Sequence, residues 1–166
     1  MYDGNKKSSK ETNKVLNDLN TELDRLKDEL ADDVLMIVIA DHGLIDVKAY
    51  DLLADKKLLS MLKRMPSMEP RATNFFVKPF LKKAFKKHFN RMYGKHFMLL
   101  SKTEFLNSKL LGTGFTHPLI HDFLGDFIGI AIDSYMFKLG SHNKFLAHHA
   151  GLTQGETEVP LVLFHK

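Results

Sequence analysis

A continuous apolar run ends in a short polar motif at Val34–Gly43, which reads VLMIVIADHG. Residues 34–40 are all apolar and rich in β-branched side chains, with no polar residue at alternate positions. This pattern predicts a strand buried on both faces, as in a parallel sheet that helices cover. A second apolar strand is predicted at Leu161–Phe164. The two runs together favour an α/β fold.

An amphipathic helix is predicted immediately before the first strand. Its apolar stripe consists of residues spaced alternately by three and four: Leu16, Leu19, Leu23, Leu26 and Leu30. Ser8 and Glu11 have the spacing of a capping box, which predicts that the helix begins there. We expect the stripe to pack against another element, because a helix followed by a buried strand is half of a βαβ unit.

The region 51–145 is predicted to mix helices and strands, without a repeat or a flexible linker. A helix is expected at Phe80–Tyr93, where Gly94 is placed to stop it. Ser101 and Glu104 form a second capping box, whose helix should end at Gly112. Further strands are expected at residues 72–77, 96–100 and 127–132.

Composition limits the chemistry. The chain has 166 residues, 44% of them hydrophobic and 27% charged, which is typical of one globular domain. It has no cysteine, so disulfides and thiolate metal sites are excluded. Nine histidines can supply imidazole ligands, and the net charge of +4 favours an anionic partner such as a phosphate ester. No apolar run is long enough to span a bilayer.

Two short motifs carry the candidate chemistry. Asp41-His42-Gly43 follows directly after a predicted buried strand, and ligand sites of open α/β sheets lie outside such strand ends. A carboxylate and an imidazole there can hold a divalent cation, although the tripeptide alone fits a strand-ending turn equally well. The second motif is His149-Ala150-Gly151-Leu152, followed by Glu156 and Val159-Pro160-Leu161. Taken alone, His148 and His149 fit surface loop histidines better than ligands.

Taken together, the two motifs resemble the type I phosphodiesterase and nucleotide pyrophosphatase family of the alkaline phosphatase superfamily. The resemblance rests on Ala-Asp-His-Gly at the end of a strand and, about a hundred residues later, His-x-Gly-Leu, Glu and Val-Pro-Leu. The segment Leu124–Gly129 is also similar, because family members often carry a Gly-Asp step there. The resemblance covers most of the chain in order and implies an alkaline phosphatase-like sheet covered by helices.

The resemblance implies a site with two divalent metal ions, with zinc expected first and manganese as the alternative. Asp41 and His42 would bind one ion, and His149 would bind the other. His148 lies one residue off the pattern and is a weaker candidate. Such a site would hydrolyse phosphate diesters or nucleotide pyrophosphates. Glu156 is expected to hold the loop that follows His149 rather than to act in catalysis.

The chain departs from the family pattern upstream of the first motif. The family places a Thr or Ser nucleophile, a further Asp ligand and an Asp-x-x-x-His pair before the helix, and none precedes Asp41 in that order. Tyr2-Asp3-Gly4 is similar to the sequence just after that pair. We therefore expect a C-terminal portion of a longer enzyme, with no nucleophile of its own and no activity in isolation. Exposed strand edges would then favour self-association.

The same resemblance divides the chain. Residues 1–44 and 146–166 are expected to form part of the metal-binding α/β core, and residues 45–145 an inserted α+β lid or substrate-selecting region. The expected partner is a small phosphate ester or nucleotide, with neither nucleic acid nor a membrane span. The expected location is cytoplasmic, although the missing signal segment at Met1 says nothing about export if the native chain begins earlier.

Other interpretations stay open from the sequence. The same motif logic serves phosphomutases, sulfatases and phosphonate hydrolases, and the chain could also be a non-catalytic remnant that binds a metal or a partner. The lysine-rich face at Lys82–Arg91 suits nucleic acid or a membrane surface, but a solvated face over an aromatic core fits better. His117, His121 and Asp122 fit loop residues better than extra ligands.

Overall fold

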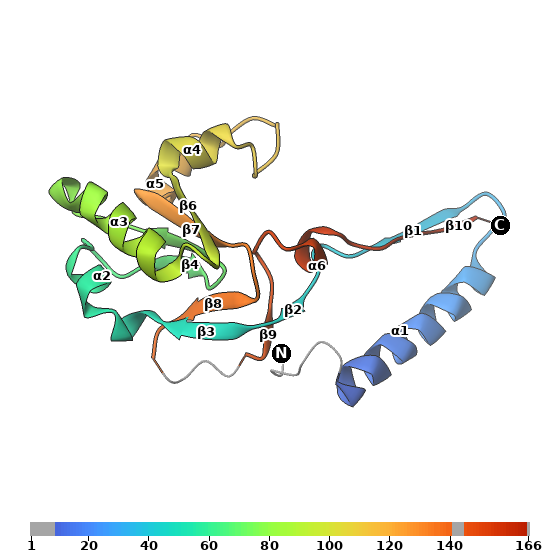
Figure 1. The fold of residues 1–166 in the computed structure, drawn as a ribbon. Helices are drawn as coiled ribbons and strands as arrows, with labels where there is room; N and C mark the ends of the chain where they lie inside the picture. The colour runs from blue at the N-terminus through green and yellow to red at the C-terminus, as the bar shows by residue number, and fades with distance from the viewer. Residues whose placement is uncertain (1–8, 141–144, 166) are drawn as a thin grey trace. The chain divides into compact units, whose positions relative to one another are not determined.

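The computed structural model describes residues 9–140 and 145–165, which fall into two compact units. The first unit comprises Met1–Val47, Lys144–His149 and Gln154–Lys166. The second comprises Lys48–Asn143 and Ala150–Thr153. The chain therefore leaves the first unit after Val47 and returns to it for its last segments (Figure 1).

The first unit is built from two antiparallel strand pairs and two helices (Figure 1). Its elements are α1 (Lys10–Glu29), β1 (Leu35–Ile39), β2 (Ile45–Asp46), β9 (Ala147–His148), α6 (Gln154–Thr157) and β10 (Leu161–His165). β1 pairs with β10, with Ile37 opposite Leu163. β2 pairs with β9, with Ile45 opposite His148. Both pairings join the start of the chain to its end.

Strands β1 and β10 form where the apolar runs predicted them, but the expected environment of β1 is wrong. β1 is antiparallel to β10, and within the described residues it has no second strand neighbour. Leu35, Ile37 and Ile39 point to one face and are 53, 56 and 63% exposed. A strand is buried on both faces only when other strands and covering helices surround it, and here a single neighbour is present.

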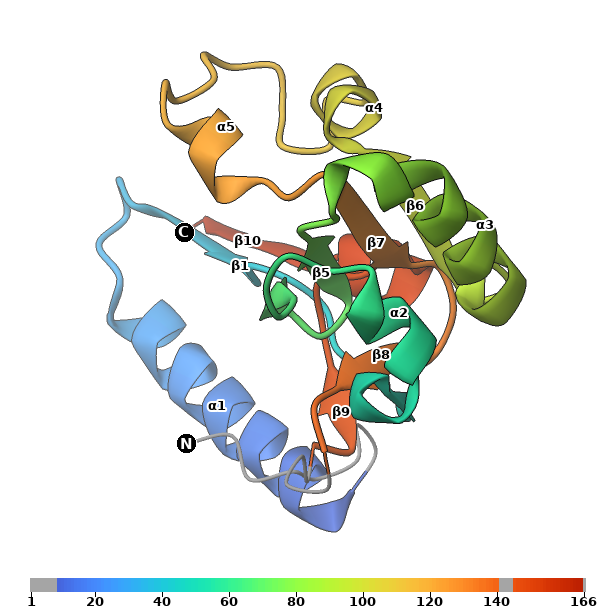
Figure 2. The same ribbon diagram turned by 90° about the vertical axis from the view of Figure 1, so that its left-hand side faces the viewer.

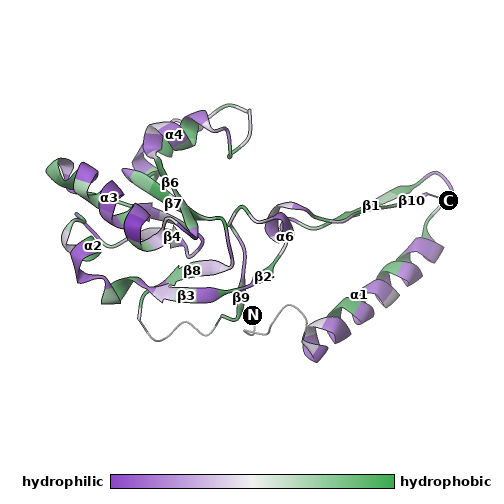
Figure 3. Ribbon diagram, viewed as in Figure 1, coloured by the Kyte–Doolittle hydropathy of each residue, from purple (hydrophilic) through white to green (hydrophobic). Residues whose placement is uncertain are grey.

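Helix α1 forms from the leucine pattern, but its first residue and its packing differ from expectation. Its N-cap is Ser9, whose Oγ accepts a 3.1 Å hydrogen bond from the Thr12 N–H. Ser8, the expected cap, lies outside the described residues. None of the helix residues is buried, and Leu16 and Leu19 are 56 and 54% exposed. Figure 3 shows apolar positions alternating with polar ones along this helix, as the sequence pattern predicts.

The second unit contains a four-stranded antiparallel sheet and a two-stranded parallel sheet. The sheet strands, in spatial order, are β4 (Ser67–Glu69), β5 (Ala72–Phe75), β7 (Phe127–Ala131) and β6 (Phe97–Ser101), and the parallel pair is β3 (Lys48–Asp51) with β8 (Tyr135–Lys138). The helices are η1 (Leu52–Ala54), α2 (Lys56–Ser60), η2 (Pro79–Leu81), α3 (Lys82–Tyr93), α4 (Lys102–Asn107) and α5 (Ile120–Phe123).

The core of the second unit is aromatic. Helix α3 lies beside the sheet strands β6 and β7 (Figure 2). Its residues Phe85 and Phe89 are both fully buried and pack against Phe75 of the sheet. Phe75 and Phe89 meet edge to face at 5.5 Å, and such pairs add about 0.5–1.5 kcal/mol beyond area burial. Gly129 in β7 makes room, because a Cβ there would lie 2.9 Å from the Phe89 ring. The packing of α3 on the sheet therefore depends on a residue without a side chain.

Most local predictions for the second unit are correct, with shifted ends. The capping box forms: Glu104 N–H donates to Ser101 Oγ at 3.3 Å, and Ser101 N–H donates to Glu104 Oε2 at 2.6 Å. Helix α4 nevertheless ends at Asn107, five residues before Gly112. Phe80 was expected on the apolar side of α3, but it lies in the preceding η2 turn and is 99% exposed.

The basic face of α3 is solvated over the aromatic core, as the sequence favoured. Lys82 pairs with Asp126 at 2.6 Å, and Lys86 lies 3.7 Å from Glu104. The opposite side of the helix buries phenylalanines of the core. Among the helices formed by residues 9–140 and 145–165, none combines the length and the apolar character that crossing a bilayer requires.

Candidate functional site

The turn after β1 holds the first motif against helix α6 of the same unit. The Gly43 N–H donates a 2.9 Å hydrogen bond to the carbonyl oxygen of Glu156. A Cβ on Gly43 would overlap the carbonyl oxygen of Gly155, so only glycine fits there without displacing the backbone. The sequence therefore folds so that the residues on either side of Gly43 are fixed relative to α6.

His42 is held in one orientation by its own neighbour. Its Nδ1 lies 2.9 Å from the Gly43 carbonyl oxygen, which can only accept a hydrogen bond. Nδ1 must therefore carry a proton, and in the neutral ring Nε2 keeps its lone pair. Nε2 lies 3.6 Å from Asp41 Oδ2, while the other Asp41 oxygen, Oδ1, accepts from the His42 N–H at 3.0 Å.

These two donor atoms suit a shared cation. Two ligands about 2.0–2.2 Å from a tetrahedral zinc ion lie roughly 3.4 Å apart. The 3.6 Å between Asp41 Oδ2 and His42 Nε2 is close to that value. A carboxylate and a neutral imidazole fit zinc or manganese, and the hydrogen bond from Nδ1 to a carbonyl is the usual way to orient a ligand histidine.

His149 joins this pair although it lies about a hundred residues away in the sequence. Its ring stacks on that of His42, with ring centroids 3.8 Å apart and planes inclined by 15°. Imidazole binds a metal ion through the lone pair of an unprotonated ring nitrogen. The structure therefore brings the predicted residues Asp41, His42 and His149 together.

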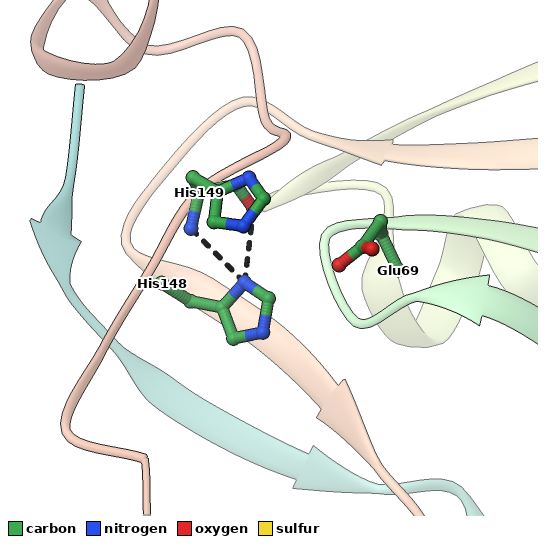
Figure 4. Close-up of side chains that lie close together, drawn as sticks. All are labelled: Glu69, His148 and His149. Carbon is green, nitrogen blue, oxygen red and sulfur yellow. Dashed lines mark hydrogen bonds between the residues drawn. The ribbon is translucent and has the colours of Figure 1, made fainter. Parts of the chain in front are cut away.

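His148 has a different environment from His149. Its Nδ1 lies 3.0 Å from the His149 N–H and 3.1 Å from the His149 carbonyl oxygen, so this nitrogen bonds to the backbone (Figure 4). Its ring stacks against His149 at 5.1 Å, and Phe145 packs edge-on at 5.7 Å. Glu69, also labelled in Figure 4, belongs to the second unit.

The stacking of the histidines was not foreseen from the sequence. What brings them together is the pairing of β2 with β9, which sets Ile45 opposite His148, together with the Gly43–Glu156 hydrogen bond. A sequence signal near this contact is the capping-box spacing of Thr153 and Glu156, which matches the helical turn of α6.

The other candidate polar groups lie elsewhere. His117, His121 and Asp122 are exposed on the α4–α5 connection and on α5, and His117 Nδ1 accepts from the Leu119 N–H at 3.2 Å. These contacts suit loop residues, as the sequence favoured.

Asp126 of the Gly-Asp step serves the packing of the second unit. Its Oδ2 accepts from the Val77 N–H at 2.8 Å, and Lys82 lies 2.6 Å from Oδ1. Partial burial raises the pKa of Asp126, but the bonds from Lys82 and Val77 and the charge of Lys63 outweigh it and leave the pKa below its usual value.

Comparison with known proteins gives likeness of structure only. No protein-family model matches the sequence, and no curated protein matches it. The solved structure of murine ectonucleotide pyrophosphatase/phosphodiesterase 5 superposes with a TM-score of 0.67 at 16% identity, covering 95% of this chain and 42% of that one. The inactive variant of the same enzyme, in complex with AMP, gives 0.66 at 16% identity.

A second hydrolase shows the same likeness. Phosphonoacetate hydrolase from Sinorhizobium meliloti 1021, in complex with phosphonoformate, superposes with a TM-score of 0.60 at 15% identity, covering 93% of this chain and 40% of that one. The chain thus spans less than half the length of each of these solved chains. At such low identity the shared feature is the fold, and this chain has the alkaline phosphatase-like α/β fold of these hydrolases.

Proposed function

We propose that this chain is part of a metal-dependent hydrolase of phosphate diesters or nucleotide pyrophosphates. Asp41 and His42 would hold one divalent ion, and His149 would hold a second. The observation that carries the proposal is the stack of His42 on His149 at 3.8 Å, beside the Asp41 carboxylate. Both rings carry imidazole nitrogens, and imidazole together with carboxylate is a ligand set that zinc and manganese accept.

The chain's own residues have definable tasks in such a site. Bound ions would polarise a phosphoryl group and stabilise a leaving oxygen. Asp41 supplies a negative charge, and its side chain is 88% exposed and so open to an ion or a substrate. Gly43 orients His42 through its carbonyl oxygen and, through its N–H, ties the motif to Glu156. No nucleophile is assigned within this chain.

The substrate class rests on the fold. One solved relative in fold is in complex with AMP, and another, a phosphonoacetate hydrolase, is in complex with phosphonoformate. Both ligands present a phosphorus oxyanion, which matches the net charge of +4 of this chain. Phosphonate hydrolysis is therefore the second candidate reaction. We further propose that residues 45–145 act as a lid or select the substrate; this role stays a prediction.

Metal binding is the first test. Titration of the purified chain with Zn²⁺ and Mn²⁺, followed calorimetrically, should show saturable binding that His42→Ala and His149→Ala each weaken about tenfold or more. His117→Ala is the matched control, because that ring lies on the exposed connection and should leave affinity unchanged. His148→Ala is expected to affect binding less than His149→Ala, since its Nδ1 bonds to the backbone.

Unchanged zinc binding in the two histidine variants would contradict the proposed metal site. If His149→Ala and His42→Ala bind zinc with wild-type stoichiometry and affinity, these rings are not ligands.

A separate assay distinguishes the candidate reactions. It measures hydrolysis of a diester, a pyrophosphate and a phosphonate by the longest protein that contains this chain. A preference for the phosphonate would favour the second candidate.

A further inference from the structure

The second unit carries a surface cavity of about 150 Å³ between α4 and α5. Its floor is apolar and consists of Phe105, Leu106 and Ile120, which belong to one of the two hydrophobic clusters of this unit. Its rim is formed by the connection between the two helices, which Figures 1 and 2 show as an open loop of chain. The rim side chains that bear on its chemistry are Lys109, Leu111, Phe115, Thr116 and His117.

Hydrogen bonds fix the loop at both ends. On the α4 side, Ser108 Oγ donates to the Phe105 carbonyl at 2.6 Å, and the Gly112 N–H donates to the Lys109 carbonyl at 2.8 Å. On the α5 side, the Ile120 N–H donates to the His117 carbonyl at 3.0 Å. These local hydrogen bonds therefore hold both ends of the loop that forms the rim of the cavity.

Lys109 is the one charged residue among those that line the cavity. None of its lining residues is acidic, and within the part of the chain that the structure describes Lys109 forms no ion pair. His117 Nδ1 accepts from the Leu119 N–H at 3.2 Å, so in the neutral ring the proton lies on Nε2, which can donate. The lining therefore combines a cation and a possible N–H donor with an apolar floor, and it contains no carboxylate.

The apolar rim is unusually open to solvent. Phe115 is fully exposed, at 109% of the reference value, and Leu111 is 66% exposed. Large apolar side chains that gather around a cavity commonly mark a binding site. A ligand that covers them would remove apolar surface from water while its charged end meets Lys109.

We propose that this cavity binds a small organic anion, with an aromatic or short alkyl body on the floor and a phosphate, phosphonate or carboxylate head at Lys109 and His117. The volume suits roughly one six-membered ring. The site lies wholly in the second unit and contains none of Asp41, His42 or His149, so this proposal does not rest on the proposed function.

Phenylphosphonate is a suitable probe, because it combines the two chemistries and has no ester bond to hydrolyse. The 166-residue chain would be titrated in the presence of a chelator, which keeps metal-bound anions out of the measurement, and followed by amide chemical shifts. Saturable shifts concentrated in residues 105–120 are expected. Inorganic phosphate and benzyl alcohol, which each carry half of the recognition, should bind at least about tenfold more weakly.

Two independent variants test the assignment. Lys109→Asn removes the charge while keeping a residue that tolerates the positive φ of 57°, and it should weaken phenylphosphonate about tenfold. Lys87→Gln, an exposed lysine on α3, is the charge-matched control and should have no effect. Gly114→Leu adds an apolar side chain at the lining, where nothing lies within 4 Å of the added Cβ, and we expect it to change the affinity for the probe, whereas Thr113→Leu, outside the lining, should not.

Two results would overturn the proposal. The first is a set of shifts that spreads over the lysines of α3 and responds equally to Lys109→Asn and Lys87→Gln, which would mean nonspecific attraction to a basic surface. The second is wild-type affinity in both Lys109→Asn and Gly114→Leu, which would place the probe outside this cavity.

Discussion

Gly43 and Glu156 are joined by a backbone hydrogen bond of 2.9 Å, and the carbonyl oxygen of Gly155 fills the space that a side chain on Gly43 would need. The contact ties the turn that carries Asp41 and His42 to the helical turn that follows the second motif. Backbone atoms, and not side-chain contacts alone, therefore hold together two motifs that lie far apart in the sequence.

Gly43→Ala should disturb this junction. The added methyl group would overlap the Gly155 carbonyl, and overpacking of this kind costs about 1–3 kcal/mol. We expect a lower free energy of unfolding in urea and weaker zinc binding, because His42 is oriented by the Gly43 carbonyl. Gly114→Ala is the control: its added Cβ meets open space, so stability should change by less than about 0.5 kcal/mol. Equal stability of both variants would contradict the close approach.

Ala150→Gly should not destabilise the protein, although most alanine-to-glycine changes do. Ala150 has a φ of 76°, a left-handed conformation that costs a residue with a Cβ about 1–2 kcal/mol. Removing the Cβ relieves that strain. The gain offsets the loss of stability that comes from the larger conformational entropy of glycine in the unfolded chain. The free energy of unfolding should stay equal or rise by up to about 1 kcal/mol.

The control for Ala150→Gly is Ala84→Gly in helix α3. Ala84 is exposed and helical, so the glycine should cost about 1 kcal/mol there. If both variants lose the same stability, the left-handed backbone at residue 150 is not a source of strain.

Asp126→Asn should destabilise the second unit at neutral pH. The carboxylate accepts from Val77 and pairs with Lys82, and hydrogen bonds to a charged group contribute about 1.5–3 kcal/mol. Asp122→Asn, an exposed change on α5, is the control and should have little effect. Urea unfolding of the three proteins at pH 7 measures the difference.

The pH dependence of that difference has a definite sign. Because the pKa of Asp126 is lowered in the folded state, its contribution is fully present above the unfolded value of about 4 and is lost as the pH falls through the folded pKa. The gap in stability between wild type and Asp126→Asn should therefore shrink below about pH 4. A gap that grows on acidification would mean that the pKa is raised instead.

Ile37→Lys should reduce self-association, which the exposed face of β1 and β10 leads us to expect. Ile37 is 56% exposed and lies opposite Leu163, also 56% exposed, so the two form an open apolar patch. Sedimentation velocity over a range of concentrations should show less association for Ile37→Lys than for wild type. Asn20→Lys on the polar face of α1 adds the same charge and should leave association unchanged; equal effects would point to net charge alone.

Local sequence patterns determined the elements of this chain. The leucine spacing determined α1, the Ser101–Glu104 box determined the start of α4, and the apolar runs determined β1 and β10. These features depend on interactions between residues at most four positions apart, which a short window of sequence contains in full. Asp41, His42 and His149 became candidate ligands in a different way, through the resemblance of two motifs taken together, because either motif alone fits a turn or a surface loop.

Only the tertiary structure decided how these pieces meet. The exact end of a helix depends on small differences in free energy between neighbouring capping residues. Helix α1 is capped by Ser9, whereas the sequence predicted Ser8. The antiparallel pairing of β1 with β10, the exposed face of β1 and the stack of His42 on His149 join residues more than a hundred positions apart. An apolar run predicts that a strand is covered by other elements. The strand's direction and its neighbours follow from chain connections and packing, which no local pattern encodes.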